Sequence, residues 1–499
     1  MTKINKTATL LAVLIVLGDI LPAQIKRDPR MVSLGGAYTV LADGIYAVGV
    51  NPANLSYQHD KPFMWQMFTL NYGLLNNFFS LENYTKYNGA NLERENEKLK
   101  TEFFNEIGDG LRFTMDSHMA LPALNYTAGN MAFTSDFVMI GDIKIPKDMF
   151  HLILKGNPLN RPLDLTLGYE VMGLTEYGFS FAVPYDKFSW GATIKFLQGF
   201  FYLGIDEEES LANIVTDTTA FYGSVRYLLR QGIGGSGYGL DLGFTFKEFD
   251  GWRVGFSLIN AVGRIYWNRP SITKDLLGVD GNKGIFSYKG QDVIDGASIL
   301  YVGSIDSVSG TKLENIEFSE LFIDDTNGVV IQVVLDSDES ITLPNGQVVE
   351  PDETVIIKLE DWKNIPENDK EKFKTGEKFS IRYPAIFRFG VSKQVDKDFL
   401  VAADLVAGFQ DRLFVQKQWK LSMGLKFTRF PGFPLRIGFS WGGRYSKELG
   451  MGFGVYKGPV MFDFALSLRN GLWIHTMKGI GISMSLSLTG LKGRGDDNE

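Results

Sequence analysis

The sequence predicts an all-β protein: a transmembrane antiparallel β-barrel of about 14 strands, with an N-terminal plug inside the lumen and a large extracellular insertion. Three observations support this fold class. Large apolar residues alternate strictly with small or polar ones over many stretches, which indicates strands with two different faces. The 55 glycines and the 13% aromatic content are typical of closed antiparallel barrels. Short and long connections also alternate along the C-terminal part.

The first residues have the features of a secretory signal peptide, which we place at residues 1–23. Lys3 and Lys6 precede an apolar run, Ala8 to Leu17, that is too short to cross a bilayer as a helix. Ala23 provides the cleavage site. The chain has no cysteine, which excludes disulfides and thiolate catalysis. Together with the barrel pattern, these features predict a protein of the bacterial outer membrane.

Residues 24–60 are predicted to form a compact apolar plug of short helices and turns. Asn51 before Pro52 is a good helix start, because its side chain can accept a bond from a free backbone N–H. Gly35, Gly36 and Gly44 permit tight turns with positive φ. A segment this short cannot bury its own apolar residues, so it needs an enclosure.

The barrel is predicted over residues 61–490, and a polar periplasmic tail over residues 491–499. A soluble sandwich would also alternate, but its outer face would be mostly charged. Here the polar face is rich in Gly and Ser, and the other face is large and apolar, as in a barrel that faces lipid. The alternating stretches are 163–171, 188–196, 240–246, 252–258, 421–427, 435–441 and 480–488.

The alternation of connection lengths predicts which end of the barrel each segment reaches. Short turns at 396–398, 430–434 and 457–459 place the C-terminus on the periplasmic side. The same parity makes 248–251 a periplasmic turn and sends residues 262–385 outside. We expect seven strands before this insertion and seven after it, with the region 71–159 hardest to divide into strands.

The insertion carries the net negative charge of the chain. Residues 271–385 hold 22 of the 58 acidic residues and 11 of the 50 basic ones, so the net charge of −8 is concentrated there. Strands are predicted at 329–335, 347–349 and 354–359, which gives a small β-rich cap. The cap is interpreted either as a solvated surface loop or as a lid or docking element. A second interruption, 91–107, is predicted to be a short amphipathic helix.

The plug region resembles a known family. The motifs S-L-G-G-A-Y (33–38), L-A-D-G (41–44) and N-P-A-N-L (51–55) resemble the N-terminal hatch of FadL-like outer-membrane proteins, and 239–243 with 255–260 resembles a strand pair of that group. The group includes channels for fatty acids and hydrocarbons and the PorV-type proteins of a secretion system. The resemblance implies 14 strands and passive uptake of hydrophobic small molecules through a barrel gated by its plug.

On this basis two sets of plug residues are predicted to act. Those expected to gate the channel are Gly35, Gly36, Asp43, Asn51, Pro52 and Ala53. Those expected to contact an apolar ligand are Leu34, Tyr38, Leu41, Ile45, Tyr46 and Val48. The expected partners are outer-membrane lipid and an apolar small molecule. The alternatives are a PorV-like docking platform that binds secreted proteins through the acidic 271–385 loop, and a structural envelope protein.

No motif in the sequence favours an enzyme, a cofactor or a metal site, and an acidic chain gives no support for nucleic-acid binding. The glycines of 232–237 match a dinucleotide-binding pattern, but no helix follows them, so a Gly-rich loop is predicted. The loop 280–284 and the acids at 336–339 are weak calcium candidates. Inward carboxylates are expected to pair with inward bases; the candidates are Asp164, Glu170, Asp241, Asp404 and Asp463 with Arg226, Arg388, Arg436 and Arg469.

Overall fold

The computed structural model describes residues 27–57, 63–90, 92, 96–122, 124–207, 209–218, 220–267, 287–288, 291–292, 298–309, 328–370, 372–375, 379–409, 419–443 and 446–490. The predicted signal peptide (1–23), the polar tail predicted at 491–499 and the calcium candidate at 280–284 lie outside these residues.

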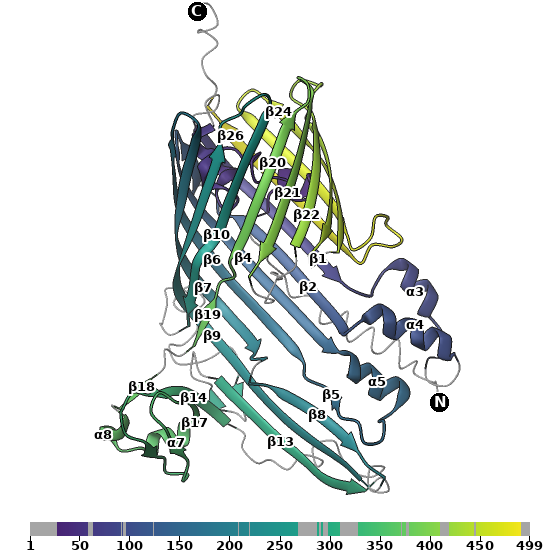
Figure 1. Ribbon diagram of the computed structural model, residues 1–499, viewed down its shortest axis with the longest axis vertical. Helices are drawn as coiled ribbons and strands as arrows, with labels where there is room; N and C mark the ends of the chain where they lie inside the picture. Colours follow the sequence, from purple (N-terminus) through teal and green to yellow (C-terminus); the bar gives the residue numbers. More distant parts are fainter. Residues whose placement is uncertain are drawn as a thin grey trace, which may run out of the picture.

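The described chain forms a closed antiparallel barrel of 14 strands (Figure 1). Each barrel strand pairs with the next one along the chain, and β1 (Phe63–Asn76) pairs with β26 (Gly479–Thr489) to close the ring. Seven strands precede the insertion and seven follow it, as predicted. The others are β2 (Gly110–Ala120), β4 (Met131–Pro146), β6 (Gly168–Pro184), β7 (Phe188–Ile205), β9 (Ala220–Phe246), β10 (Trp252–Tyr266), β20 (Ile386–Gln394), β21 (Phe399–Gly408), β22 (Trp419–Phe427), β23 (Leu435–Gly442), β24 (Lys447–Lys457) and β25 (Val460–Arg469).

The wall has one apolar and one polar face, and the alternation in sequence determines both. In β22, Met423 points outward with 56% of its surface exposed, whereas Ser422 beside it is fully buried inside. In β23, Ile437 is outside and Ser440 is inside. The predicted alternation is therefore confirmed in these strands, and the outer surface of the barrel is an apolar belt.

The two ends of the barrel differ in the length of their connections. Residues 395–398, 428–434 and 458–459 are tight turns at one end, which we call the turn end, and β26 finishes there (Figure 1). The opposite end, which we call the loop end, carries the helices and the insertion. This arrangement agrees with the predicted parity, including the turn between β9 and β10.

The loop end carries added helices and short strands. The predicted amphipathic helix at 91–107 is α4 (Glu97–Ile107), which buries Phe103, Phe104 and Ile107. One strand prediction was wrong: 163–171 is not continuous, because Leu165 and Thr166 bond to Ala212 instead of the barrel wall. The remaining elements of the loop end are α3 (Leu81–Tyr87), α5 (Lys147–Lys155), β5 (Leu163–Asp164) and β8 (Leu211–Thr216). One further short strand, β3 (Asn125–Ala128), lies at the turn end.

The insertion is β-rich, and its predicted strands are confirmed. It has its own apolar core, in which Leu335, Val349 and Ile357 are almost completely buried. Its elements are β11 (Ser287–Tyr288), β12 (Gln291–Asp292), β13 (Ser298–Ser309), β14 (Gly328–Leu335), β15 (Ile341–Thr342), β16 (Val348–Val349), β17 (Thr354–Lys358), α7 (Leu359–Asn364), α8 (Glu367–Lys370), β18 (Phe373–Thr375) and β19 (Ser380–Arg382).

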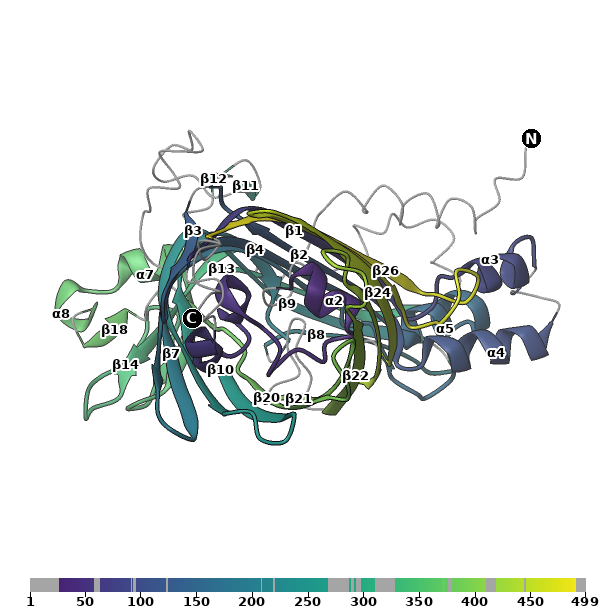
Figure 2. The same ribbon diagram turned by 90° about the horizontal axis from the view of Figure 1, so that it is seen from above.

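Residues 27–57 lie inside the barrel near the turn end, and we call them the inner segment (Figure 2). It consists of α2 (Pro29–Ser33), η2 (Gly44–Ala47) and η3 (Pro52–Tyr57), joined by turns. Gly35 and Gly36 both have positive φ, as the sequence predicted. Nearly every side chain of the segment is buried, and its apolar residues pack together against Met64, Ala132, Ala182 and Met461 of the wall.

The inner segment approaches the wall so closely that two wall positions have no room for a side chain. A β-carbon added at Gly438 would lie 1.9 Å from the backbone carbon of Leu34, and one added at Gly450 would lie 2.0 Å from the carbonyl oxygen of Val32. Both obstacles are backbone atoms, so no side-chain rotation relieves them. Glycine at these positions is therefore required by the contact itself.

Gly438→Val should displace the inner segment or lower the stability of the barrel by about 3 kcal/mol, because overpacking a filled interior costs free energy. The matched control is Gly141→Ala, where an added β-carbon meets only side-chain atoms at 3.7 and 3.9 Å. The measurement is the urea midpoint of the folded, heat-modifiable band on gels, combined with proteolysis of the N-terminal region. Equal midpoints and equal protection for the two variants would contradict the close contact.

Candidate functional site

The lumen of the barrel is the candidate site, and a buried arginine of α2 fixes the inner segment to its wall. The Arg30 Nε donates to Asp463 Oδ2 at 2.9 Å, and its Nη1 donates to Asp43 at 2.7 Å. Arg436 binds the other oxygen of Asp463 at 2.9 Å. The Arg30 guanidinium also lies 4.4 Å from the centre of the Tyr46 ring. The wall carboxylate of Asp463 thus binds two guanidinium groups, one from the inner segment and one from the wall.

A second ion-pair group holds the start of the inner segment. Arg27 makes two hydrogen bonds to Glu448, at 3.0 and 2.9 Å, in the bidentate geometry that suits a guanidinium and a carboxylate. Lys420 binds the same carboxylate at 2.9 Å. Nearby in the wall, Arg469 binds both oxygens of Asp116. Charges buried in this way are tolerated only when they are paired.

A third wall carboxylate binds the turn that follows Gly36. Asp404 Oδ2 accepts hydrogen bonds from the backbone N–H groups of Tyr38 and Thr39, at 2.9 and 2.8 Å. Arg388 donates to the same oxygen at 3.1 Å and to the carbonyl of Gly36 at 2.9 Å. The Gly35–Gly36 turn is therefore held through its backbone.

The C-terminal half of the segment is held by neutral hydrogen bonds. Asn51 Nδ2 donates to Thr245 Oγ1 at 2.9 Å, and Asn51 Oδ1 accepts from Ala53 N–H at 3.2 Å at the start of η3. The Tyr46 hydroxyl lies 2.9 Å from that of Ser485. Asp43, one of the predicted gating residues, binds Arg30 within the segment. The gating role of these residues stays a prediction.

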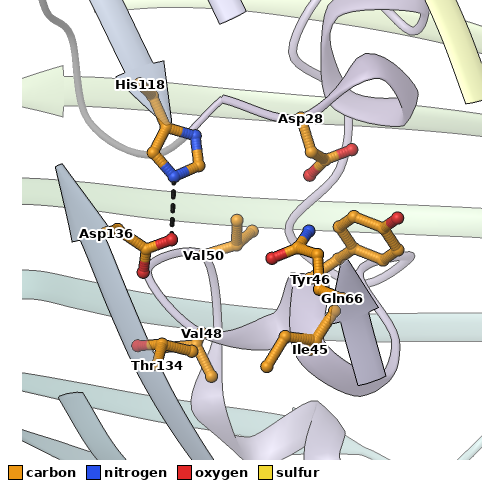
Figure 3. A pocket seen from close by; sticks show the side chains of 9 residues that line it. All are labelled: Asp28, Ile45, Tyr46, Val48, Val50, Gln66, His118, Thr134 and Asp136. Atoms are coloured by element: carbon orange, nitrogen blue, oxygen red, sulfur yellow. Dashed lines mark hydrogen bonds and ion pairs between the residues drawn. The ribbon is translucent and has the colours of Figure 1, made fainter. Parts of the chain in front are cut away.

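Two small cavities lie between the inner segment and the wall, and they contain all six predicted ligand residues. Ile45, Tyr46 and Val48 line the first (Figure 3). Leu34, Tyr38 and Leu41 line the second. The cavities have volumes of about 20 and 80 Å³. The first has room for one water molecule and the second for a few. Both are far smaller than the pockets that hold drug-sized apolar ligands.

The other wall of the first cavity carries a histidine whose role the sequence did not reveal. His118 Nδ1 lies 3.1 Å from the carbonyl oxygen of Arg27, and Nε2 lies 3.0 Å from Asp136 Oδ1 (Figure 3). A carbonyl oxygen only accepts, so Nδ1 carries a proton and donates it. The second contact joins Nε2 to a carboxylate oxygen of the wall strand β4. His118 thus bridges the inner segment and the wall.

Towards the loop end, an aromatic cluster fills the lumen at a second level. Trp267 is 1% exposed and packs with Tyr202, Phe379 and Tyr383. Its ring takes the space that side chains would need at inward-facing glycines, because a β-carbon at Gly235 would lie 2.9 Å from it. Trp267 lies at the start of the insertion, directly after β10, and Phe379 lies near its end. The backbone N–H of Trp267 donates to the Phe379 carbonyl at 2.9 Å.

This packing corrects the prediction for residues 232–237. They are not a loop: they lie within β9, paired with β7. Gly232 and Gly235 lie against the Trp267 ring, which occupies the space that side chains would take there. The local sequence suggested a loop because the residue that fills the space lies some 30 positions further along the chain.

A buried polar group joins the aromatic cluster to the wall. Lys195 binds Asp241 at 3.0 Å and Glu176 at 3.3 Å. The Tyr383 hydroxyl donates to Glu176 at 2.5 Å, which ties the end of the insertion to β6. The carbonyl of Pro384 accepts from Asn260 at 3.2 Å. The insertion is thus anchored inside the lumen as well as outside the barrel.

The predicted pairing of inward charges is confirmed in part. Arg388 pairs with Asp404 and Arg436 with Asp463. Asp241 pairs with Lys195 instead of an arginine. Asp164 is exposed, and Arg226 binds Glu209 at 3.3 Å on the surface, because both lie beyond the barrel at the loop end.

The described ranges contain no group of three or more His, Cys, Asp or Glu side chains arranged to hold a metal ion. Among the same residues, no helix combines the length and the apolar character needed to cross a membrane.

The fold and its contents define a class: a closed 14-stranded barrel whose lumen holds an N-terminal segment. The chain belongs to the family described as "Family of unknown function (DUF5723)", whose model matches residues 56–465. No curated protein matches the chain.

Several solved structures are similar to the chain, all at low identity. The toluene transporter TbuX of Ralstonia pickettii is 13% identical, with a TM-score of 0.45 and coverage of 93% of this chain and 98% of that one. The toluene transporter TodX of Pseudomonas putida is 12% identical, with a TM-score of 0.44 and coverage of 94% and 99%. A Pseudomonas aeruginosa FadL homologue is 12% identical, with a TM-score of 0.46 and the same coverage. They belong to the group that the plug motif resembles.

Asp463→Asn should loosen the inner segment, because it removes the charge that neutralises Arg30 and Arg436 while it keeps the shape of the side chain. Breaking a buried pair costs about 3–5 kcal/mol. Arg226→Gln breaks an exposed pair and should cost about 0–1 kcal/mol, which makes it the control. Urea midpoints and protease cleavage within residues 27–57 measure the effect. A loss for Asp463→Asn no larger than that for the control would refute the role of Asp463.

The stability of the inner segment should also depend on pH through Asp28, the N-cap of α2 in the lumen. Burial raises the pKa of this carboxyl from 3.8 to about 6, although hydrogen bonds from Met31 and Arg30 N–H lower it. The folded protein therefore holds this proton more tightly than the unfolded chain does. Its contribution is complete below pH 3.8 and is lost as pH rises through about 6.

Asp28→Asn keeps an oxygen that can cap α2 but cannot titrate. The stability difference between the protein and this variant should therefore change by roughly 3 kcal/mol between pH 3.5 and pH 7, at about 1.4 kcal/mol per pKa unit. Parallel pH profiles of the urea midpoint for the two proteins would show that Asp28 does not titrate in this way.

Proposed function

We propose that this protein is an outer-membrane channel for the passive uptake of hydrophobic small molecules, similar to fatty acids or hydrocarbons, and that its inner segment gates the lumen. The observation that carries the proposal is the inner segment itself: an apolar element buried in the barrel and held to the wall by separate polar groups. The resemblance of residues 33–55 to the FadL-like hatch supports the same function.

The outer surface of the barrel supports the membrane location. Outward residues such as Met423, Ile437 and Trp441 are large, apolar and exposed, which is costly in water and favourable in lipid. The charged residues of the same strands face the lumen and are paired there. The loop end, with the insertion, then faces the outside of the cell, and the turn end faces the periplasm.

The size of the two cavities supports gating. Spaces for one or a few water molecules do not admit an apolar molecule, which supports a movement of the inner segment during transport. The turn at Gly35 and Gly36 and the start of η3 at Asn51, Pro52 and Ala53 are the proposed hinges, because both have backbone geometry set by glycine or proline. When the segment moves, Leu34, Tyr38, Leu41, Ile45, Tyr46 and Val48 would line the opened path.

A disulfide that locks the inner segment to the wall tests this proposal, because the natural chain has no cysteine to interfere. A β-carbon at Gly424 would lie 3.1 Å from that of Leu34. This is a few tenths of an ångström shorter than the separation in an unstrained disulfide, so a small shift of the inner segment brings the two sulfur atoms to bonding distance. Leu34→Cys with Gly424→Cys should therefore form a bond on oxidation. Uptake of a radiolabelled long-chain fatty acid and of a radiolabelled alkylbenzene by cells that make this variant should stop when it is oxidised and return when it is reduced.

The matched control joins two strands of the wall and leaves the inner segment free. Ser422 and Ser440 are paired in β22 and β23, so Ser422→Cys with Ser440→Cys should cross-link without an effect on uptake. If oxidation of the Leu34–Gly424 pair leaves uptake unchanged, the inner segment is not the gate. If cells without the protein take up both compounds equally fast, the channel function itself is wrong.

A docking platform for secreted proteins is the second candidate, and the folded core of the insertion favours it. A folded core gives the insertion a fixed surface on which a partner protein could dock. Replacement of residues 328–375 by a Gly-Ser linker keeps Trp267 and the lumenal residues 379–385. A platform would lose a co-purifying exported protein in this variant, and a channel would keep its uptake.

A further inference from the structure

An apolar surface lies outside the barrel at the loop end, away from the lumen and from the insertion. The connection between β25 and β26 exposes Trp473 at 75% and Ile474 at 66%, with Leu472 beside them. Helix α3 exposes Leu81 at 54% and Tyr84 at 55%. We call these five residues the side platform. Large apolar side chains gathered at one place on a surface indicate an interaction site.

The two segments of the side platform are fixed to each other. The backbone N–H of Glu82 in α3 donates to the carbonyl of His475 at 3.0 Å. At the barrel edge, Asn76 Nδ2 donates to the carbonyl of Lys478 at 2.6 Å, and Lys478 Nζ donates to that of Asn77 at 3.0 Å. The platform is therefore part of a rigid connection between β1 and β26.

The orientation of α3 follows from what its other face buries. Asn83 and Tyr87 are buried and bond to Glu106 of α4, at 2.5 and 3.2 Å. Leu81 and Tyr84 are three residues apart, so they share a different side of the helix. The α3–α4 contact thus uses one face and leaves the apolar pair exposed.

The platform extends sideways from the barrel. The connection between β25 and β26, drawn in yellow, projects from the barrel wall and lies next to α3 (Figure 1). Seen along the barrel, α3, α4 and α5 lie outside the ring of strands (Figure 2). Towards the turn end, outward residues of β1 and β26 such as Leu70 and Ile482 continue this apolar surface into the belt.

We infer that the side platform docks on the lipid of the outer leaflet, with Trp473 and Ile474 at the boundary between acyl chains and headgroups. Continuity with the apolar belt favours lipid over a protein partner. Trp and Tyr also suit this boundary, because each has an apolar ring and a polar atom. The inference rests on the proposed membrane location. It adds a lipid contact on one flank only, which fixes the depth and the tilt of the barrel.

Site-directed spin labelling tests the inference, and the absence of cysteine means that one introduced residue takes the only label. The test positions are Ile474→Cys and Tyr84→Cys, both exposed, so neither substitution removes a buried contact. Met423→Cys in the belt is the lipid reference, and Val348→Cys, 52% exposed in the insertion, is the water reference. The full-length protein is placed in phosphatidylcholine vesicles that contain phosphatidylglycerol, and the accessibility of each label to oxygen and to a water-soluble nickel chelate is measured.

The ratio of oxygen to nickel accessibility should be several-fold higher at 474 and 84 than at 348, and should approach the ratio at 423. Ratios at 474 and 84 equal to that at 348, with 423 in lipid, would overturn the side platform and leave the barrel proposal intact. A low ratio at 423 would overturn the membrane location itself. Low accessibility of the label at 474 to both oxygen and the nickel chelate would indicate a protein contact instead and would also overturn the inference.

Discussion

The structure depends on how closely the inner segment approaches the barrel wall. At Gly438 and Gly450 backbone meets backbone, and this brings the arginines of the segment within reach of carboxylates that are completely buried. Removing such charges from water costs several kcal/mol per ion, and only good pairing offsets the cost. The wall carboxylates Glu448 and Asp463 each pair with one arginine of the inner segment and with one base of the wall. Displacement of the segment would have to replace these contacts with water, which a lumen open to solvent can supply.

The lumen is closed at two levels by different parts of the chain. The inner segment fills the turn end, and Trp267 with Tyr383 fills the level below the insertion. Because Tyr383 is bonded to Glu176 and Phe379 to Trp267, the end of the insertion is part of the second closure. Transport through the whole lumen would need both to open. The end of the insertion is therefore attached to the wall and to Trp267 inside the lumen.

Much of the fold could be predicted from the sequence because a barrel wall is a local pattern. In each strand successive residues alternate between the apolar and the polar face, and the connection lengths indicate the direction of each strand. The strand number, the insertion point and helix α4 followed from these signals. The start of η3 was also local, since Asn51 and Pro52 are adjacent.

The contents of the lumen could not be read in the same way, because their partners lie far apart in the chain. Arg27 and Glu448 are 421 residues apart, and Arg30 and Asp463 are 433 apart. The alternation predicts that Asp463 faces the lumen, whereas it does not identify Arg30 as its partner. His118 gave no signal, since a lone histidine has no spacing to interpret. The glycines of β9 suggested a loop because Trp267, which packs on them, lies outside the strand.

The central claim is that the inner segment is a closure that an apolar ligand can move. The most direct measurement is amide hydrogen exchange of the protein in lipid, with and without a saturating long-chain fatty acid. The account predicts faster exchange in residues 27–57 with the ligand and unchanged exchange in β21 to β26. Slow exchange of the inner segment under both conditions, in protein that still takes up the ligand, would contradict it.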